Sequence, residues 1–469
     1  MACTTLLVGK NASYDGSTMI ARNEDSCAGQ FETKKLWVVT PEQQPRHYKS
    51  VISKVEIDLP DNPMRYTSVP SGDGIQGIWA AAGVNEENIS MTATETLTSN
   101  PLVLGADPLV ENGIGEEDLV TLTLPYIHNA REGVIRLGML HETYGTYEMN
   151  GIAFSDVNEI WWFETIGGHH WMARRVPDDC YVVMPNQLGI DYFDFEDAYG
   201  KQENYMCSSD LKEFVIKNHL NLSMDGNFDP RSTFGSHSDA DHVYNTPRAW
   251  YMLKYFNPEL DIQPLDDNLP WCYKPNKKIT VEDVKYILSS HYQGTEYDPY
   301  LKHGNKDKMN CFRTIGINRN NFLSCVQLRP YVPKQIQAVE WICFASNVYN
   351  AFIPFYGNVN EVPAFYSTCE SHASTNSLYW TSRIIAALAD PEFNETNAII
   401  ERYQEKVASI GHHIINQYDE KFMETKDLHM LVEANEEIAK QVQELTYDVL
   451  DKVLFIRSNN MKNKFSLSD

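Results

Sequence analysis

The sequence predicts an α+β fold, in which strands are concentrated in the first 185 residues and helices are interleaved among them and then dominate the C-terminal part. Two observations lead to this class. Short β-branched and aromatic runs bounded by turn residues recur through the first 185 residues. Apolar residues three and four positions apart recur after residue 378. No internal repeat, low-complexity tract or linker interrupts the chain, which favours one large domain with insertions over a string of small ones.

The expected strands of the N-terminal part are short runs separated by glycine-containing turns. Asp15-Gly16, Asp73-Gly74 and Gly167-Gly168 mark several of these turns. The strands are expected at residues 4–9, 18–23, 35–40, 77–82, 89–96, 151–154, 160–165, 170–176 and 181–184. Between them, residues 118–129 and 130–144 are expected to form helices, and the second should pack on the sheet.

The middle of the chain is more polar. Residues 191–245 are rich in Asp, Asn, Ser and Gly and are interpreted as an insertion with one helix near residues 209–217. Short helices are expected at 246–256 and 280–289, the latter opened by Thr280 with an acid three residues later. A polar stretch at 294–312 is predicted to be a loop near the site, followed by strands at 314–318, 323–327 and 340–344.

The C-terminal region, residues 378–456, is expected to be helical, with helices at 378–388, 394–418 and 430–455. The last helix carries one apolar stripe, made of Leu431, Ile438, Val442, Leu445, Val449 and Val453. A stripe of this kind serves a core or a contact between subunits far more often than a ligand groove. A homo-oligomer therefore stays open.

Composition excludes several classes of partner. The 39 basic and 64 acidic residues leave a net charge of −25, which makes nucleic acid and anionic membranes poor partners. The sequence contains no signal-like segment and no run of about twenty apolar residues. Nine cysteines without framework spacing fit a reducing compartment, so a cytoplasmic location is expected.

Metal and cofactor motifs are not found in the sequence. The histidine pairs His169-His170 and His412-His413 lack zinc-ligand spacing, and neither Cys-x-x-Cys nor His-Glu-x-x-His occurs. No glycine-rich phosphate loop supports nucleotide binding. The expectation is a protein without metal or cofactor.

The start of the chain carries the strongest chemical signal. Cys3 precedes a strand-like run, and Arg22 and Asp25 follow after the first turn. If Met1 and Ala2 are removed, Cys3 carries a thiol and a free α-amine on one residue. Such an amine has a pKa of about 7.7–8.0 and can accept the proton of the thiol, which makes a nucleophile and its base from a single residue.

These N-terminal residues resemble the dipeptidase A family, cysteine peptidases of the N-terminal-nucleophile superfamily that are related to bile-salt hydrolases, penicillin V acylases and secernins. The resemblance rests on Cys3-Thr4-Thr5, the Asp-Gly-Ser turn at 15–17 and the Ile-Ala-Arg-Asn-Glu-Asp run at 20–25. It continues in order through segments at 83–86, 91–96, 161–164, 169–171, 183–187, 244–250, 340–341 and 356–357. It implies a four-layer αββα sandwich spanning residues 1–469 as one domain, with residues 1–2 removed as a propeptide.

The resemblance also implies roles for individual residues. Cys3 is expected to be the nucleophile, Arg22 to lie beside its thiol, and Asp25 to hold the α-amine. Asn186 matches the asparagine that helps bind the oxyanion. Arg248 is the candidate for a second arginine that braces the aspartate and the nucleophile.

One position departs from the pattern of the bile-salt hydrolases, which place another oxyanion asparagine where this sequence has Glu95. An ionised carboxylate cannot donate to an oxyanion, so Glu95 is expected to bind a substrate ammonium instead. The expected function is hydrolysis of unblocked dipeptides through a thioester on Cys3, with a dipeptide as the partner. Two alternatives stay open: an acylase of the bile-salt hydrolase or penicillin V acylase type, and a secernin-like binding protein in which Cys3 is never unmasked.

Overall fold

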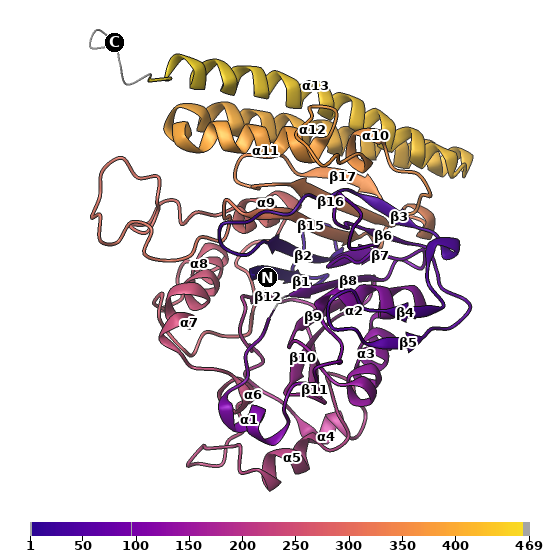
Figure 1. The fold of residues 1–469 in the computed structure, drawn as a ribbon, viewed down its shortest axis with the longest axis vertical. Coiled ribbons are helices and arrows are strands. Elements are labelled where there is room, and N and C mark those ends of the chain that lie inside the picture. The colour runs from indigo at the N-terminus through magenta and orange to yellow at the C-terminus, as the bar shows by residue number, and fades with distance from the viewer. Residues whose placement is uncertain (1, 95, 463–469) are drawn as a thin grey trace.

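The computed structural model describes residues 2–94 and 96–462. Two sheets face each other through β1, β2, β7, β8, β9 and β15, and helices cover the outer side of each. The helices α9, α11, α12 and α13 contact the first sheet, whereas α2 and α3 contact the second. Figure 1 shows α12 and α13 lying side by side next to β17. The predicted four-layer αββα sandwich is confirmed.

The first sheet is antiparallel and has seven strands. Its order places the two N-terminal strands at its centre. From edge to edge it runs β14 (Cys272–Tyr273), β12 (Tyr181–Met184), β1 (Ala2–Val8), β2 (Thr18–Asp25), β15 (Asn320–Leu328), β16 (Ala338–Phe344) and β17 (Ile353–Tyr356). Strands far apart in the sequence therefore flank the hairpin that carries Cys3.

The second sheet has six strands. It runs β13 (Tyr205–Cys207), β11 (His170–Arg175), β10 (Ile160–Ile166), β9 (Gly151–Ser155), β8 (Ser90–Thr94) and β7 (Ala82–Val84). Two small antiparallel pairs lie outside the main sheets: β3 (Trp37–Val39) with β6 (Tyr66–Ser68), and β4 (His47–Lys49) with β5 (Glu56–Asp58).

The helices differ widely in length. Two of them, α12 (Phe393–Thr425) and α13 (His429–Asn459), exceed thirty residues. The others are α1 (Pro101–Ala106), α2 (Glu116–Thr123), α3 (Ala130–Tyr144), α4 (Phe195–Ala198), α5 (Leu211–Lys217), α6 (Pro230–Phe234), α7 (Asp239–Tyr244), α8 (Thr246–Phe256), α9 (Val281–Leu288), α10 (Ala364–Ser367) and α11 (Leu378–Ala389). Within the described ranges, no helix combines the length and apolar character that a membrane span needs.

The buried apolar residues separate the layers. Leu7 and Ile20 belong to the core between the two sheets, together with Trp162 of the second sheet. Leu6 and Ala21, the next residues along the same two strands, belong to the core beneath the helices. This alternation follows from the two-residue period of a strand, and it decides which side chains of β1 and β2 meet which layer.

Several predicted elements match closely and others do not. The helices at 130–144 and 246–256 have the predicted bounds, and the three C-terminal helices are present. The strand predicted at 314–318 is wrong, because the chain there is irregular and β15 begins only at Asn320. The strand predicted at 77–82 is shifted to β7, since Gly77 has a positive φ of 78° within a turn. The segment at 191–245 contributes β13 to the edge of the second sheet.

Candidate active site

Cys3 is buried on the face of β1 that looks toward the second sheet. Cys3 pairs with Glu24, and Thr5 pairs with Arg22, in the antiparallel register of β1 and β2. Directly paired residues share a face of the sheet, and so do residues two apart on one strand. Cys3, Arg22 and Glu24 therefore project together into the space between the sheets.

Arg22 contacts the thiol and a carboxylate from another layer. Its Nη2 lies 2.9 Å from Cys3 Sγ and 2.5 Å from Oε1 of Glu116, the first residue of α2. Its Nη1 lies 3.6 Å from Oε2 of Glu24. All three side chains are almost completely buried. The position predicted for Arg22 beside the thiol agrees with this geometry.

A buried lysine extends this charged cluster. Nζ of Lys34 lies 2.6 Å from Glu24 and 3.2 Å from Glu32. One arginine and one lysine thus pair with Glu116, Glu24 and Glu32, and the arginine also contacts the thiol. The cluster holds more carboxylates than cations, so it suits a further positive charge at the nucleophile.

The pKa of the Cys3 thiol is raised to about 12. Burial is the largest cause, because the interior solvates a thiolate poorly; Arg22 lowers the pKa, while Glu116 and Asp25 raise it further. The effect expected of Arg22 is thus present but smaller than that of burial. In this geometry the thiol is neutral, and its activation needs a base within reach.

The backbone of Cys3 is held by polar side chains from two other segments. Its N–H donates to Oδ1 of Asn186 at 3.1 Å. Arg248 of α8 donates from Nη1 to the Cys3 carbonyl and, at 2.7 Å, to the hydroxyl of Thr4. The same arginine donates from Nη2 to Oδ1 of Asn186 at 2.9 Å and to Oδ1 of Asn245 at 2.6 Å. Arg248 therefore holds the backbone of the strand that carries Cys3, and its catalytic role stays a prediction.

The aspartate is braced by a different arginine from the one predicted. Asp25 accepts hydrogen bonds from Nη2 of Arg313 and, at 2.9 Å, from Nδ2 of Asn320. The hydrogen bonds of Arg248 run to Cys3, Thr4, the two asparagines and the carbonyl of Tyr244, so the expectation that it also binds Asp25 is corrected. Arg313 follows the loop predicted at 294–312, whose end therefore reaches the site.

Sequence reasoning missed Glu116 and Arg313. Glu116 opens a run of three acids at the start of a helix, a pattern that usually serves the helix dipole. Arg313 stands in an irregular segment with no local motif. Glu95, predicted to bind the substrate ammonium, lies outside the described residues. Within those residues, no three His, Cys, Asp or Glu side chains are placed to hold a metal.

A cysteine at the start of a central strand, inside a four-layer αββα fold, is the arrangement of N-terminal-nucleophile hydrolases that the sequence resembles. The model of Peptidase family C69 matches residues 2–406. The chain belongs to that family, whose members are cysteine-type peptidases.

Relatives and one solved structure can be compared directly. A probable dipeptidase A of Streptococcus pyogenes serotype M3 (strain SSI-1) is 54% identical, and a dipeptidase of Bifidobacterium longum (strain NCC 2705) is 50% identical, each over 100% of both chains. Dipeptidase A of Lactobacillus helveticus is 44% identical over 100% of this chain and 99% of its own. The C2A mutant of a conjugated bile acid hydrolase from Clostridium perfringens is 10% identical, with a TM-score of 0.32, over 77% of this chain and 95% of its own.

Proposed function

We propose that the protein is a cysteine dipeptidase that hydrolyses the single peptide bond of unblocked dipeptides through a thioester on Cys3. The observation that carries this proposal is that polar side chains contact both reactive groups of Cys3. Nη2 of Arg22 lies 2.9 Å from its thiol sulfur, and Oδ1 of Asn186 lies 3.1 Å from its nitrogen. The names of full-length relatives at 44–54% identity support the same reaction. Removal of Met1 and Ala2 converts the nitrogen of Cys3 from an amide into an amine.

The chemistry then proceeds in two steps. The α-amine of Cys3 accepts the thiol proton, and Sγ attacks the carbonyl carbon of the first substrate residue. The α-ammonium returns its proton to the leaving amine as the peptide bond breaks, which leaves a thioester. Water, deprotonated by the same amine, attacks the thioester and releases the first amino acid. Asp25 and Asn186 hold the α-amine in both steps.

Asn186 is the oxyanion donor in this mechanism. Its Oδ1 accepts hydrogen bonds from Cys3 N and from Arg248, so the orientation of its amide is determined. Nδ2 is then the group with which Asn186 donates to the oxyanion. Removal of one such donor costs about 3–4 kcal/mol of transition-state stabilisation in enzymes of this chemistry.

Glu116 is our candidate for the group that binds the substrate ammonium. In the first residue of the substrate, the α-nitrogen lies about 2.5 Å from the carbonyl carbon that the sulfur attacks. A carboxylate that binds this ammonium must therefore lie close to the attacking sulfur. Cys3 Sγ and Glu116 Oε1 contact the same Arg22 nitrogen, and their separation cannot exceed the sum of those two distances, 2.9 and 2.5 Å. Within the described residues, Arg22 alone forms hydrogen bonds or ion pairs with the Glu116 side chain.

The same charges disfavour an acylase. An apolar acyl chain placed beside Cys3 would bury Arg22, Glu24 and Glu116 against hydrocarbon without new hydrogen bonds, which is costly. A substrate with a free ammonium adds a counter-charge instead. The nine cysteines form no disulfide, which supports our further proposal of a reducing, cytoplasmic location. The apolar stripe of the last helix is buried in the core of the chain itself, so a contact between subunits stays a prediction that this stripe does not support.

The test combines the intact mass of the purified protein with hydrolysis of Leu-Leu. We expect the mass to lack Met1 and Ala2 and the protein to hydrolyse the dipeptide. Hydrolysis by a chain of full mass would overturn the amine-as-base mechanism. A processed chain that cleaves a conjugated bile salt but not Leu-Leu would favour the acylase, and a full-length chain without activity on either would favour the binding protein.

A further inference from the structure

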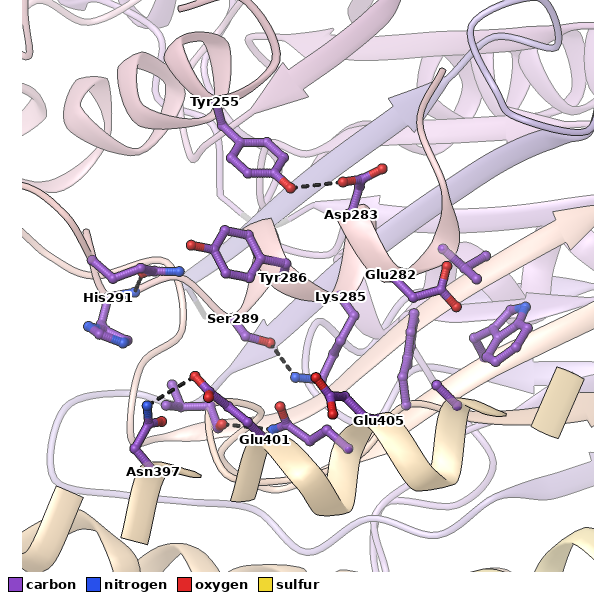
Figure 2. Close-up of a pocket in the computed structure, with 17 residues that line it drawn as sticks. Tyr255, Glu282, Asp283, Lys285, Tyr286, Ser289, His291, Asn397, Glu401 and Glu405 are labelled. Carbon is purple, nitrogen blue, oxygen red and sulfur yellow. Dashed lines mark hydrogen bonds between the residues drawn. The ribbon is translucent and has the colours of Figure 1, made fainter. Parts of the chain in front are cut away.

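A cavity of about 510 Å³ lies on the helical side of the first sheet, away from the thiol. It is lined by α9, by α12 and by Trp341 of β16 and is partly open to solvent, and Phe352 and Val348 add to its apolar wall. Figure 2 shows the side chains that line it. Its volume is in the range of cavities that bind small molecules.

One wall of the cavity carries a cation without a counter-ion. Nζ of Lys285 on α9 donates to Oγ of Ser289 and to the carbonyl of Asn347, both at 2.8 Å. Within residues 2–94 and 96–462, no carboxylate forms an ion pair with it. Burial lowers the pKa of Lys285 to about 8, which reflects an ammonium that lacks a compensating negative charge. An anion bound next to Nζ would supply that charge.

The opposite wall carries two solvent-exposed carboxylates without cations. Glu401 and Glu405 stand four residues apart on α12, and Figure 2 shows Lys285 extending from α9 toward them. Glu401 accepts one hydrogen bond, from Asn397 at 3.0 Å, and no described cation forms an ion pair with either glutamate. Two like charges at this spacing repel each other weakly, so a bound cation would relieve both.

The remaining acids of the cavity are already engaged. Glu282 lies 2.6 Å from Nε2 of His412, and Asp283 accepts a hydrogen bond from the hydroxyl of Tyr255 at 2.8 Å. The groups left for a ligand are thus one ammonium on one side, two carboxylates on the other and an apolar surface between. This set is complementary to a small zwitterion with an apolar side chain.

We propose that this cavity binds a free α-amino acid, with its carboxylate on Lys285, its ammonium on Glu401 and Glu405, and its side chain against Trp341 and Phe352. The binding is argued from the cavity alone. A role for the bound amino acid as a sensed product rests on the proposed dipeptidase function.

A route from this cavity to the catalytic hairpin is present. Asn347, whose carbonyl accepts from Lys285, donates from Nδ2 to Oδ1 of Asn23 at 2.8 Å. Asn23 lies on β2 between Arg22 and Glu24. Ligand binding that shifts Lys285 therefore acts on the strand that positions the arginine of the nucleophile.

The test is isothermal titration calorimetry of L-leucine and L-phenylalanine into the full chain with Cys3→Ala, which removes turnover. We expect saturable binding of at least one amino acid in the millimolar range, and binding at least about tenfold weaker for the analogues leucinamide and 4-methylpentanoate, which each lack one charge. Adding Lys285→Met should abolish this binding, whereas the surface control Lys440→Met should leave it intact. Glu401→Gln with Glu405→Gln should weaken leucine but not 4-methylpentanoate, and Glu444→Gln should change neither.

Binding in the active site could also give heat, and the variants separate the two sites. Binding that persists unchanged in the Lys285→Met chain would place the amino acid elsewhere and overturn the proposal, as would no binding of either amino acid at about 20 mM. If Lys285→Met does not fold, Lys285→Gln replaces it, and the comparison of leucine with 4-methylpentanoate still decides. Hydrolysis of Leu-Leu by the unsubstituted chain tests the proposed function independently.

Discussion

The two faces of the β1–β2 hairpin hold different kinds of polar group. On the face toward the second sheet, Cys3 and Arg22 lie beside Glu116, where we propose that the substrate binds. On the face toward the helices, Thr4 is bound to Arg248 and Asp25 to Arg313. Neighbouring residues on one strand thus serve opposite purposes, because successive side chains point to opposite faces.

The interactions that hold the polar groups in place also differ between the two faces of the hairpin. On the inner face, Arg22 and Glu24 are held by buried ion pairs: Nη1 of Arg22 lies 3.6 Å from Glu24, and Nζ of Lys34 lies 2.6 Å from Glu24. On the outer face, Asn23 donates to the carbonyls of Leu288 and Ile315, and Asp25 accepts on both oxygens. The inner face is thus held mainly by ion pairs, whereas on the outer face asparagine side chains also hold the hairpin with hydrogen bonds.

The largest expected effect is on the inner face. Cys3→Ala should lower kcat/KM for Leu-Leu by roughly 10⁴-fold or more, because no other group replaces the nucleophile. Thermal unfolding should change little, since the substitution removes one sulfur atom. Cys325→Ala, at an equally buried cysteine of β15, is the matched control and should retain activity when folded. Retained hydrolysis in the Cys3 variant would end the nucleophile assignment.

The next effect tests the outer face. Asp25→Asn should lower kcat by about 10²–10³-fold, because the neutral amide no longer orients the α-ammonium of Cys3 or pairs with Arg313. The measurement is steady-state hydrolysis of Leu-Leu together with circular dichroism. Asp15→Asn, at the turn end of the same hairpin, is the control and should leave kcat within about twofold. Equal losses in both variants would mean that Asp25 acts only through stability.

A smaller effect sharpens the role of Glu116. Glu116→Gln should lower kcat/KM for Leu-Leu by about 10- to 100-fold, since a charged hydrogen bond to the substrate ammonium is lost. Hydrolysis of 4-methylpentanoyl-leucine, which lacks that ammonium, should change far less. Glu117→Gln alters a neighbouring buried acid that binds Ser50 and Ser53, and it should keep the preference for Leu-Leu. If both substrates lose activity equally in the Glu116 variant, the residue only positions Arg22.

The smallest expected effect comes from the contrast between two buried acids, one that forms an ion pair with a cation and one that does not. Glu24 has the ammonium of Lys34 at 2.6 Å, whereas no described cation forms an ion pair with Glu340 on β16, and only a hydrogen bond with Thr67 lowers the pKa of Glu340. Burial raises the pKa of Glu340 to about 7. The pKa of Glu340 in the folded state lies above its unfolded value of 4.5. The contribution of its protonated carboxyl to the free energy of unfolding is therefore fully present below pH 4.5 and is lost as the pH rises through 7.

Glu340→Gln should therefore raise the free energy of unfolding at pH 8 by about 1–3 kcal/mol relative to its effect at pH 4.5. Urea unfolding at the two pH values measures this difference. The exposed control Glu361→Gln should show no such pH dependence. A Glu340 variant whose effect is the same at both pH values would show that the carboxyl does not titrate in this range.

A feature of the structure can be predicted from the sequence when the residues that determine it are close together in the chain. The helices at 130–144 and 246–256 could be predicted because helical periodicity is a property of one short window of sequence, whereas the helix expected at 118–129 ends at Thr123. The strand at 314–318 was predicted wrongly because a β-like run says nothing about a partner strand. The structure brings Arg22, Asn186 and Arg248 into contact with Cys3, whereas the hydrogen bonds of Asp25 run to Arg313 and Asn320, so its hold on the α-amine stays a prediction.

By itself the sequence determined the α+β class, the candidate nucleophile and the residues expected around it, because strand periodicity and short motifs are properties of neighbouring residues. Only the tertiary structure decided which arginine holds Asp25 and which acid faces the thiol. Arg313 is 288 residues from Asp25, and Glu116 is 94 residues from Arg22. The cavity between α9 and α12 belongs to the same class of fact, since its charges are complementary only once two distant helices pack on one sheet.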